Sequence, residues 1–263
     1  MKTVIIIPAR FQSVRFPGKP LVKLNCGMGV KKSLIQLTWE AANKVRDIDE
    51  IFVATDDRRI SDAVNEFGGK TVMTSKSCKN GTERCAMVLE DIKLESDVII
   101  NFQGDAPLTP PSFVGTLIEV MKQNRNIDIA TPVLRLNYSE YKRFQTDRKI
   151  GLIGGTTVTF DKNGLAMYFS KEIIPFCDEK KISKASVVPI FQHVGVYAYR
   201  PKVLKEYLTW PESELEIIEG LEQLRFLENG KVIKCAEVEN KGQVFWELNN
   251  PEDVPRIEGE LTG

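Results

Sequence analysis

The sequence has little of several features that mark specialised classes of protein. Its five cysteines are an odd number, lie far apart and include no C-x-x-C pair, so they predict neither a disulfide framework nor a zinc site. Reduced thiols are the expectation. Lysine plus arginine and aspartate plus glutamate each number 36, so no excess of one charge predicts coating of nucleic acid or of an anionic membrane.

Long apolar runs are also lacking. The apolar segment near the start covers only residues 4–8, which is too short for a signal-peptide core or a membrane span. We therefore expect a cytoplasmic protein with no membrane or nucleic-acid partner. No repeat, low-complexity tract or Gly/Ser linker divides the chain, and 263 residues suit one domain with a substantial insertion.

Several catalytic signatures are missing as well. The string G-x-S-x-G does not occur and there is one histidine, His193, which disfavours Ser-His-Asp hydrolysis. A Walker loop and a G-x-G-x-x-G fingerprint are both lacking, which disfavours ATPases and Rossmann-type oxidoreductases. His193 itself could act as an acid or base near neutral pH, or could be a hydrogen-bonded orienting group in an apolar strand.

Short β-rich runs alternate with segments of helical spacing in the first half of the chain. The runs cover residues 4–8, 51–55, 70–73, 97–102 and 127–133, and the helical segments cover 34–45, 58–67, 82–92 and 112–122. This rhythm predicts an α/β fold with a mostly parallel sheet and helices on both faces. Beyond residue 134 we expect extra strands with a hairpin around 161–164, a helix over 215–227, a strand over 231–238 and a closing helix after Asn250.

The segment PARFQSVRFPGKPL, residues 8–21, is the strongest local signal. Three cations, Arg10, Arg15 and Lys19, follow a short apolar strand, and Gly18 permits close approach of the backbone. Converging cations on such a loop suit a polyphosphate, which indicates nucleotide chemistry. A solvated basic loop is the alternative.

Other polar clusters follow predicted strands. Ligands of such sheets bind beyond the carboxyl ends of the strands, so we expect the Thr55-Asp56-Asp57 and Gln103-Gly104-Asp105 turns to share one rim with the phosphate loop. Asp105 is the first candidate ligand for Mg²⁺, although it could instead cap the helix near Pro110.

Two further clusters allow both a structural and a functional role. Asn80 and Gly81 begin a helical stretch and could bind a base or carboxylate, or could form a simple cap. Glu222 and Gln223 belong to a segment whose apolar spacing indicates packing, yet the pair could point into a cleft.

Eight motifs in this order resemble the 3-deoxy-manno-octulosonate cytidylyltransferases, also called CMP-Kdo synthetases. They are PARFQSVRFPGKPL, VATDD, NGTERC, NFQGDAPLTPP, YFSKEIIPF, HVGVYAYR, LEQLRFLENG and NNPEDV. The resemblance implies a Rossmann-like, GT-A-like nucleotidyltransferase domain over residues 1–263. It also implies an inserted β-rich acceptor and dimerisation region at about 135–200, and hence a homodimer.

The resemblance further implies a reaction, in which the anomeric hydroxyl of a 3-deoxy-octulosonic acid attacks the α-phosphorus of CTP and pyrophosphate leaves. Arg10, Arg15, Lys19 and Asp105 would be catalytic, with Mg²⁺ as cofactor. The nucleotide would contact Pro8, Ala9, Arg10, Ser13, Arg15, Lys19, Asn80, Gly81 and Gln103. The acceptor would contact Arg84, Gln103, His193, Tyr197, Glu222 and Gln223.

The chain also departs from the family pattern. The family has V-D-T-P-E-D near its end, with the first Asp a metal ligand, whereas Asn249 stands at that position here. Glu247 is a possible substitute, because it lies on the same face of an extended segment. Val158 replaces an expected lysine, Lys171 replaces an arginine, and residues 26–31 add about four positions.

These departures leave two alternatives open. One is a cytidylyltransferase for a different acidic, phosphonate or phosphorylated acceptor. The other is a catalytically impaired homologue that keeps the nucleotide pocket.

Overall fold

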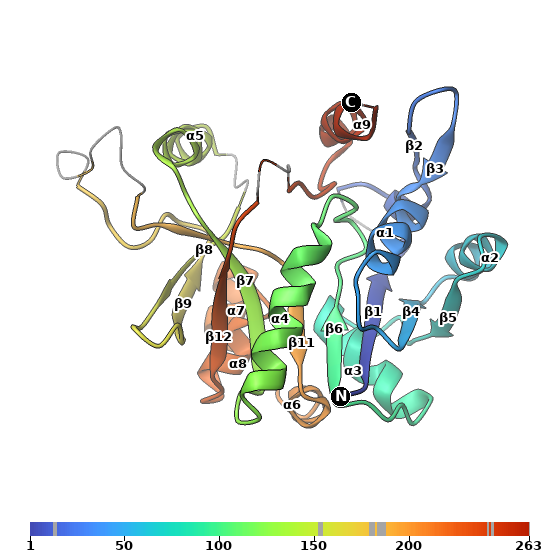
Figure 1. Cartoon of the computed structure of the whole chain (residues 1–263), viewed down its shortest axis with the longest axis horizontal. Coiled ribbons are helices and arrows are strands. Elements are labelled where there is room, and N and C mark those ends of the chain that lie inside the picture. Colours follow the sequence, from blue (N-terminus) through green and yellow to red (C-terminus); the bar gives the residue numbers. More distant parts are fainter. Residues whose placement is uncertain are drawn as a thin grey trace.

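A mixed sheet runs through the molecule, with helices on both faces (Figure 1). The computed structural model describes residues 1–12, 15–151, 155–178, 182, 188–240, 242 and 245–262. Within this part of the chain, the sheet has ten strands in the order β5-β4-β1-β6-β11-β7-β10-β8-β9, and β12 pairs with β7. The first half supplies β1 (Thr3–Ala9), β4 (Glu50–Thr55), β5 (Lys70–Met73), β6 (Val98–Asn101) and β7 (Ile129–Arg135). The second half supplies β8 (Thr157–Phe160), β9 (Ala166–Ser170), β10 (Phe191–His193), β11 (Tyr197–Tyr199) and β12 (Ile233–Val238).

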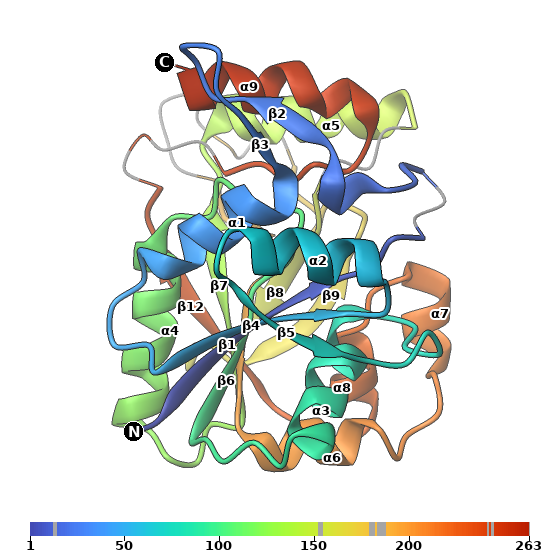
Figure 2. The same ribbon diagram turned by 90° about the vertical axis from the view of Figure 1, so that its right-hand side faces the viewer.

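The alternation of side chains along β1 explains the two covered faces. Ile5 and Ile7 pack with α1 (Leu34–Asn43), α2 (Arg58–Glu66) and α4 (Pro111–Gln123). Val4 and Ile6 pack with α3 (Gly81–Asp91), α6 (Pro201–Tyr207) and α8 (Leu224–Glu228). Figure 2 shows α4 and α3 on opposite sides of the sheet. The α/β fold and these first-half elements confirm the predictions.

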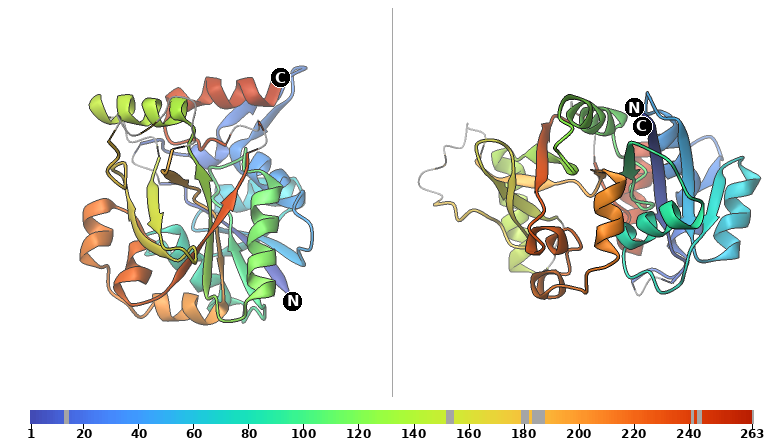
Figure 3. Two further views of the ribbon diagram at one scale, coloured as in Figure 1. Left: turned by 60° about the vertical axis from the view of Figure 1, so that its left-hand side comes forward. Right: turned by 90° about the horizontal axis from the view of Figure 1, so that it is seen from below.

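The run of adjacent parallel strands is interrupted where β11 enters the sheet, and β12 pairs with β7 in parallel beyond it. Strands β5, β4, β1 and β6 are parallel, whereas β11 lies antiparallel between β6 and β7, and pairs Tyr197 with Asn101. The expected hairpin is present as β8 and β9, which turn at Gly164 with φ 73°. Strands β8 to β10 thus extend the central sheet, and Figure 3 shows the hairpin close to α7 (Glu214–Glu219) and α8.

The helix expected over residues 215–227 is wrong. Helices α7 and α8 are separate, because Gly220 adopts a left-handed conformation with φ 60° and ends α7. Apolar spacing continued across this break, so the pattern predicted one helix where the chain makes two.

A further layer lies beyond the carboxyl end of β1. The hairpin of β2 (Lys23–Asn25) and β3 (Lys31–Ser33) packs beside α9 (Val254–Thr262), and α5 (Tyr138–Lys149) lies across the same end of the sheet (Figure 2). The additional residues 26–31 form the turn of this hairpin and the first residue of β3. Leu24, Leu248 and Ile257 share a small core there, which fixes the segment before α9 above the rim of the sheet. The 3-10 helices are η1 (Lys19–Leu21) and η3 (Pro251–Asp253).

Candidate active site

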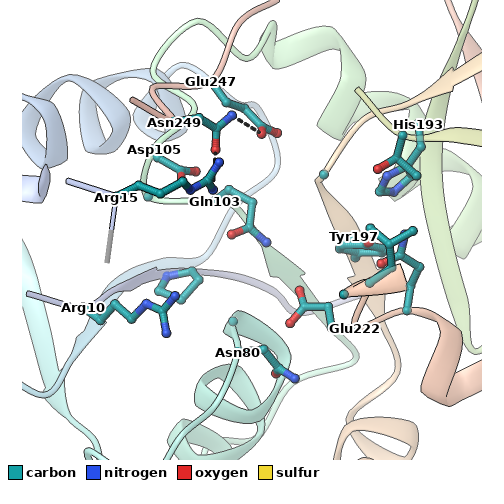
Figure 4. A pocket seen from close by; sticks show the side chains of 18 of the residues that line it. Arg10, Arg15, Asn80, Gln103, Asp105, His193, Tyr197, Glu222, Glu247 and Asn249 are labelled. Atoms are coloured by element: carbon teal, nitrogen blue, oxygen red, sulfur yellow. Dashed lines mark hydrogen bonds between the residues drawn. The ribbon is translucent and has the colours of Figure 1, made fainter. Parts of the chain in front are cut away.

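A pocket of about 980 Å³ opens at the carboxyl ends of β1 and β6. The phosphate loop that follows β1 forms one side, and residues of β10, β11 and the segment 216–223 form the other (Figure 4). The Gln103-Gly104-Asp105 turn lies between these two sides. Residues predicted for the nucleotide and for the acceptor therefore line the same cavity.

The phosphate loop is closed by its own backbone. Gly18 donates its N–H to the carbonyl oxygen of Phe11 at 2.9 Å and has φ 71°, a conformation that favours glycine. Arg10, Arg15 and Lys19 line the pocket, and Figure 4 shows Arg10 and Arg15 on one side of it. Arg10 and Arg15 are exposed on this wall, and Lys19 is half-buried. Ser13 lies outside the described residues.

Gly104 explains how the QGD turn meets the end of β1. A Cβ atom at Gly104 would lie 2.5 Å from the carbonyl oxygen of Pro8, which is too close for any side chain. Thr38 of α1 donates a hydrogen bond of 3.1 Å to the Gly104 carbonyl oxygen from the buried side. The turn is therefore pressed against the start of the phosphate loop, which places Asp105 beside it.

Asp105 does not cap the following helix. Its carboxylate accepts a hydrogen bond of 2.5 Å from Lys19 Nζ, and α4 begins after Pro110 without a side-chain cap. The Asp105 carbonyl oxygen accepts a bond of 2.8 Å from the Leu248 N–H, which brings the segment before α9 to the same corner. Asp105 thus lies where the phosphate loop meets the segment before α9.

Glu247 and Asn249 flank Leu248 and face the Asp105 corner (Figure 4). Burial and the neighbouring Asp105 carboxylate raise the pKa of Glu247 above its ordinary value. Two carboxylates and an amide oxygen form a hard donor set, which fits Mg²⁺ bound together with nucleotide phosphates. Among the described residues, no cluster of three or more His, Cys, Asp or Glu side chains offers a metal site.

The start of α3 serves both structure and pocket. Asn80 accepts a bond of 2.8 Å from the Glu83 N–H as the helix cap, and its amide nitrogen donates to Tyr207 Oη at 3.0 Å. A Cβ atom at Gly81 would lie 3.2 Å from Pro8 Cγ and 3.4 Å from Gln103 Nε2. The predicted cap is therefore present and lines the cavity, and binding of a base or carboxylate by this segment stays a prediction.

The Thr55-Asp56-Asp57 turn lies on the predicted rim, because Thr55 pairs with Ala9 at the ends of β4 and β1, but it does not line the pocket. Asp56 accepts a bond of 3.3 Å from Arg84, which also donates to Thr74 Oγ1 at 2.6 Å, and Asp57 caps α2. The turn thus contributes to the pocket indirectly, by holding the guanidinium of Arg84. Arg84 lines the cavity, but 2% of it is exposed and its guanidinium is held by these partners.

His193 is buried and hydrogen-bonded in the structure. Its Nε2 atom lies 3.0 Å from Thr131 Oγ1, and its ring meets Phe169 edge-on at 5.1 Å. Burial lowers the pKa of His193 to about 3, so the ring is neutral at ordinary pH. Tyr197 packs beside it with the ring centroids 5.3 Å apart, and both residues line the pocket.

Glu222 and Gln223 line the same wall of the pocket as His193 and Tyr197. Glu222 accepts a bond of 3.2 Å from the Thr82 N–H at the start of α3, and burial raises the pKa of Glu222 to about 7. Gln223 is 3% exposed, and its Nε2 atom has no hydrogen-bond partner in the described structure. A buried amide without a partner is costly, which marks Gln223 as ready for a ligand.

One buried ion pair that the sequence motifs do not predict supports this wall. Arg225 of α8 makes two bonds to Glu216 of α7, at 2.6 and 2.7 Å, and also donates to Glu83 at 3.1 Å. An arginine within the otherwise apolar run LEQLRFL was the available signal. Two positions that depart from the family pattern have different environments. Val158 is buried in the core, and Lys171 lines the pocket.

Comparisons with known proteins agree with the motifs. A family profile described as Cytidylyltransferase matches residues 4–233. A 3-deoxy-manno-octulosonate cytidylyltransferase of Maricaulis maris is 40% identical over 259 residues, covering 98% of this chain and 96% of the relative. One of Thermodesulfovibrio yellowstonii is 41% identical, covering 97% and 96%.

A solved structure of a CMP:2-keto-3-deoxy-manno-octonic acid synthetase complexed with CTP is similar over 98% of both chains, with a TM-score of 0.82 and 34% identity. A cytidylyltransferase of Leptospira borgpetersenii shares the fold at 14% identity and a TM-score of 0.61, covering 98% of this chain and 85% of the other. The predicted resemblance is confirmed, and the chain belongs to the cytidylyltransferase family, among the 3-deoxy-manno-octulosonate cytidylyltransferases.

Proposed function

We propose that the protein transfers CMP from CTP to the anomeric hydroxyl of 3-deoxy-manno-octulosonate and releases pyrophosphate. The observation that carries this proposal is the shared pocket, in which a cationic loop and Asp105 face a wall of polar acceptor-side residues. The curated relatives carry the name of this activity over nearly the full chain length. The acceptor oxygen forms a bond to the α-phosphorus, the bond from that phosphorus to the oxygen bridging to the β-phosphate breaks, pyrophosphate leaves, and the proton of the hydroxyl is released to solvent.

The phosphate side of the pocket would compensate the negative charge of the triphosphate. Arg10, Arg15 and Lys19 would bind the triphosphate, and Lys19 can exchange its contact with Asp105 for a phosphate oxygen. Ser13 joins this set by resemblance. Pro8, Ala9, Asn80, Gly81 and Gln103 would surround the cytidine. No covalent nucleophile is required, because in-line positioning and charge stabilisation account for such transfers.

Cytidylyltransferases typically use a divalent metal, and we propose Mg²⁺ here. Asp105 would hold it, together with Asn249 or Glu247 and the phosphates of CTP. When bound, the ion would neutralise charge that develops on the phosphate oxygens. The protein's own residues orient the phosphates around that position.

The acceptor side recognises the sugar acid. We propose that Arg84, Gln103, His193, Tyr197, Glu222 and Gln223 contact or orient it. The unpartnered Gln223 amide supports this role, since a sugar hydroxyl or carboxylate would satisfy it. Gln103 lies between Gly81 and Gly195, so it can touch both substrates.

Assembly and location are further proposals. We infer a homodimer through the region 135–200, and a place in the cytoplasm, where CTP is available. No helix among the described residues is long and apolar enough to cross a membrane.

The test measures pyrophosphate release from CTP and Mg²⁺ with a panel of acceptors. We expect release with 3-deoxy-manno-octulosonate and none without an acceptor. Release only with another acidic or phosphorylated acceptor would instead support the alternative acceptor. Binding of CTP without release on any acceptor would support the impaired homologue.

A further inference from the structure

We infer that Glu247, and not Asn249, is the second side chain that holds the divalent cation together with Asp105. In this arrangement Asn249 is a positioning residue that links Arg15 to Glu247. The inference deepens the proposed function and rests on its metal-assisted nucleotide site. It decides between the two ligands that the sequence left open.

The segment before α9 presents alternate side chains to the cavity. Leu248 is fully buried among Leu24 and Ile257, and its N–H bonds to the Asp105 carbonyl oxygen at 2.8 Å. Because Leu248 points into the core, its neighbours Glu247 and Asn249 both point toward Asp105 (Figure 4). Either position can therefore reach the metal corner, and the partners of each side chain must decide.

The partners of Asn249 place its oxygen beside a cation. Arg15 Nη2 donates to Asn249 Oδ1 at 3.3 Å. This amide oxygen is neutral and already accepts from the guanidinium, so it attracts a divalent cation less strongly than a carboxylate does. The amide nitrogen of Asn249 points the other way and lies 3.5 Å from Glu247 Oε2. The amide is thus oriented with its acceptor on the arginine and its donor on the carboxylate.

Glu247 has the opposite environment. Among the described residues, its carboxylate has no ion pair within 4.0 Å and only the long contact from Asn249. Asp105 already has Lys19 as its partner, so the corner carries one carboxylate whose charge is not compensated by direct contact. A Cβ atom at Gly195 would lie 3.1 Å from Glu247 Oε1, so a glycine in the pocket wall leaves room for this carboxylate.

A metal ligand at position 247 in place of position 249 also keeps the charge of the site. A carboxylate at position 247 restores the negative charge that an amide at position 249 lacks, and the longer glutamate side chain reaches in from two residues earlier. Magnesium bound with phosphates takes one or two protein carboxylates, which Asp105 and Glu247 supply. Asn249 is then free to hold Arg15 toward the triphosphate.

The experiment measures binding of Mn²⁺ by electron paramagnetic resonance, on the full chain with CTP and without acceptor. Glu247→Gln should weaken Mn²⁺ binding by about tenfold or more, as Asp105→Asn does, whereas Asn249→Ala should change it by less than about threefold. Asn249→Ala should instead weaken CTP binding measured by calorimetry, because Arg15 loses its anchor. Glu252→Gln, an exposed carboxylate in the same segment, is the matched control and should change neither.

Thermal unfolding of each variant checks that the fold is kept. A loss of Mn²⁺ affinity in Asn249→Ala as large as in Asp105→Asn, or unchanged affinity in Glu247→Gln, would overturn the inference. Wild-type protein that binds CTP but no Mn²⁺ would overturn it as well. Failure of the proposed function has a different signature, namely Mn²⁺ binding that depends on Glu247 without pyrophosphate release on any acceptor.

Discussion

The guanidinium carbon of Arg59 lies 3.4 Å from the centroid of the Phe11 ring, so the first turn of α2 covers the phosphate loop from outside. Asp57 fixes the guanidinium with two bonds of 2.9 and 2.7 Å. On the loop itself, a Cβ atom at Gly18 would lie 3.2 Å from Phe11 Cζ. The ring therefore connects α2 to the glycine that closes the loop.

Arg59→Ala should raise the KM for CTP by about two- to fivefold, because an exposed cation–π contact contributes roughly 0.5–1 kcal/mol. The KM for the acceptor should not change. Steady-state kinetics with each substrate varied in turn provide the measurement. Arg58→Ala, one residue away and exposed, is the control. An equal rise for both substrates would show that Arg59 does not act through the loop.

Gly104→Ala should greatly lower kcat/KM for CTP. The new methyl group would lie 2.5 Å from the Pro8 carbonyl oxygen, so the backbone that carries Arg10 must move. Gly115→Ala in α4 is the matched control, since a Cβ atom there meets nothing within 4 Å and should stabilise the helix by up to about 1 kcal/mol. Urea unfolding and kinetics on both variants separate loss of fold from loss of site geometry. Normal turnover of Gly104→Ala would refute the close approach.

Glu216→Ala should lower the free energy of unfolding by about 3 kcal/mol or more, because it leaves most of the Arg225 charge buried without its bidentate partner. The exposed pair of Arg135 and Glu237 offers the comparison, and Glu237→Ala should cost less than about 1 kcal/mol. Urea denaturation at neutral pH measures both. Similar losses for the two variants would contradict the role assigned to burial.

His193 should make the fold sensitive to acid. Its pKa is about 3 in the folded protein and near 6.5 when unfolded, so between these values the unfolded chain binds more protons. The contribution to stability is complete above pH 6.5 and falls by about 1.6 kcal/mol between pH 6.5 and 5. His193→Gln should remove this part of the pH dependence in urea unfolding. Parallel curves for wild type and variant would show that His193 is not buried in its neutral form.

Local signals carried most of the fold prediction. Strand β1 was predicted because residues 4–8 are apolar on both faces, and the helices between the first strands have regular spacing. The break at Gly220 was missed, since apolar spacing says nothing of a left-handed residue. The antiparallel entry of β11 between β6 and β7 depends on pairing across about 70 to 100 residues, which no local pattern encodes.

The site divides in the same way. The phosphate loop and the QGD turn are short motifs, and both line the cavity as predicted. Arg59 on Phe11 and Arg225 on Glu216 join residues that are distant or separated by a helix break, so only the folded chain reveals them. The Asp56 turn has the polar composition of a ligand-binding site, yet the Asp56 carboxylate is paired with Arg84.

The seam between β6 and β11 has a consequence for how this enzyme can diversify. Asn101 on one strand faces Tyr197 on its neighbour, so the two walls of the pocket belong to one continuous sheet and are not joined by a hinge. The relative position of the two walls is therefore set by strand pairing. The cationic loop after β1 and the residues of β10 and β11 lie on different walls of the pocket, so a substitution on one wall can leave the contacts of the other wall unchanged.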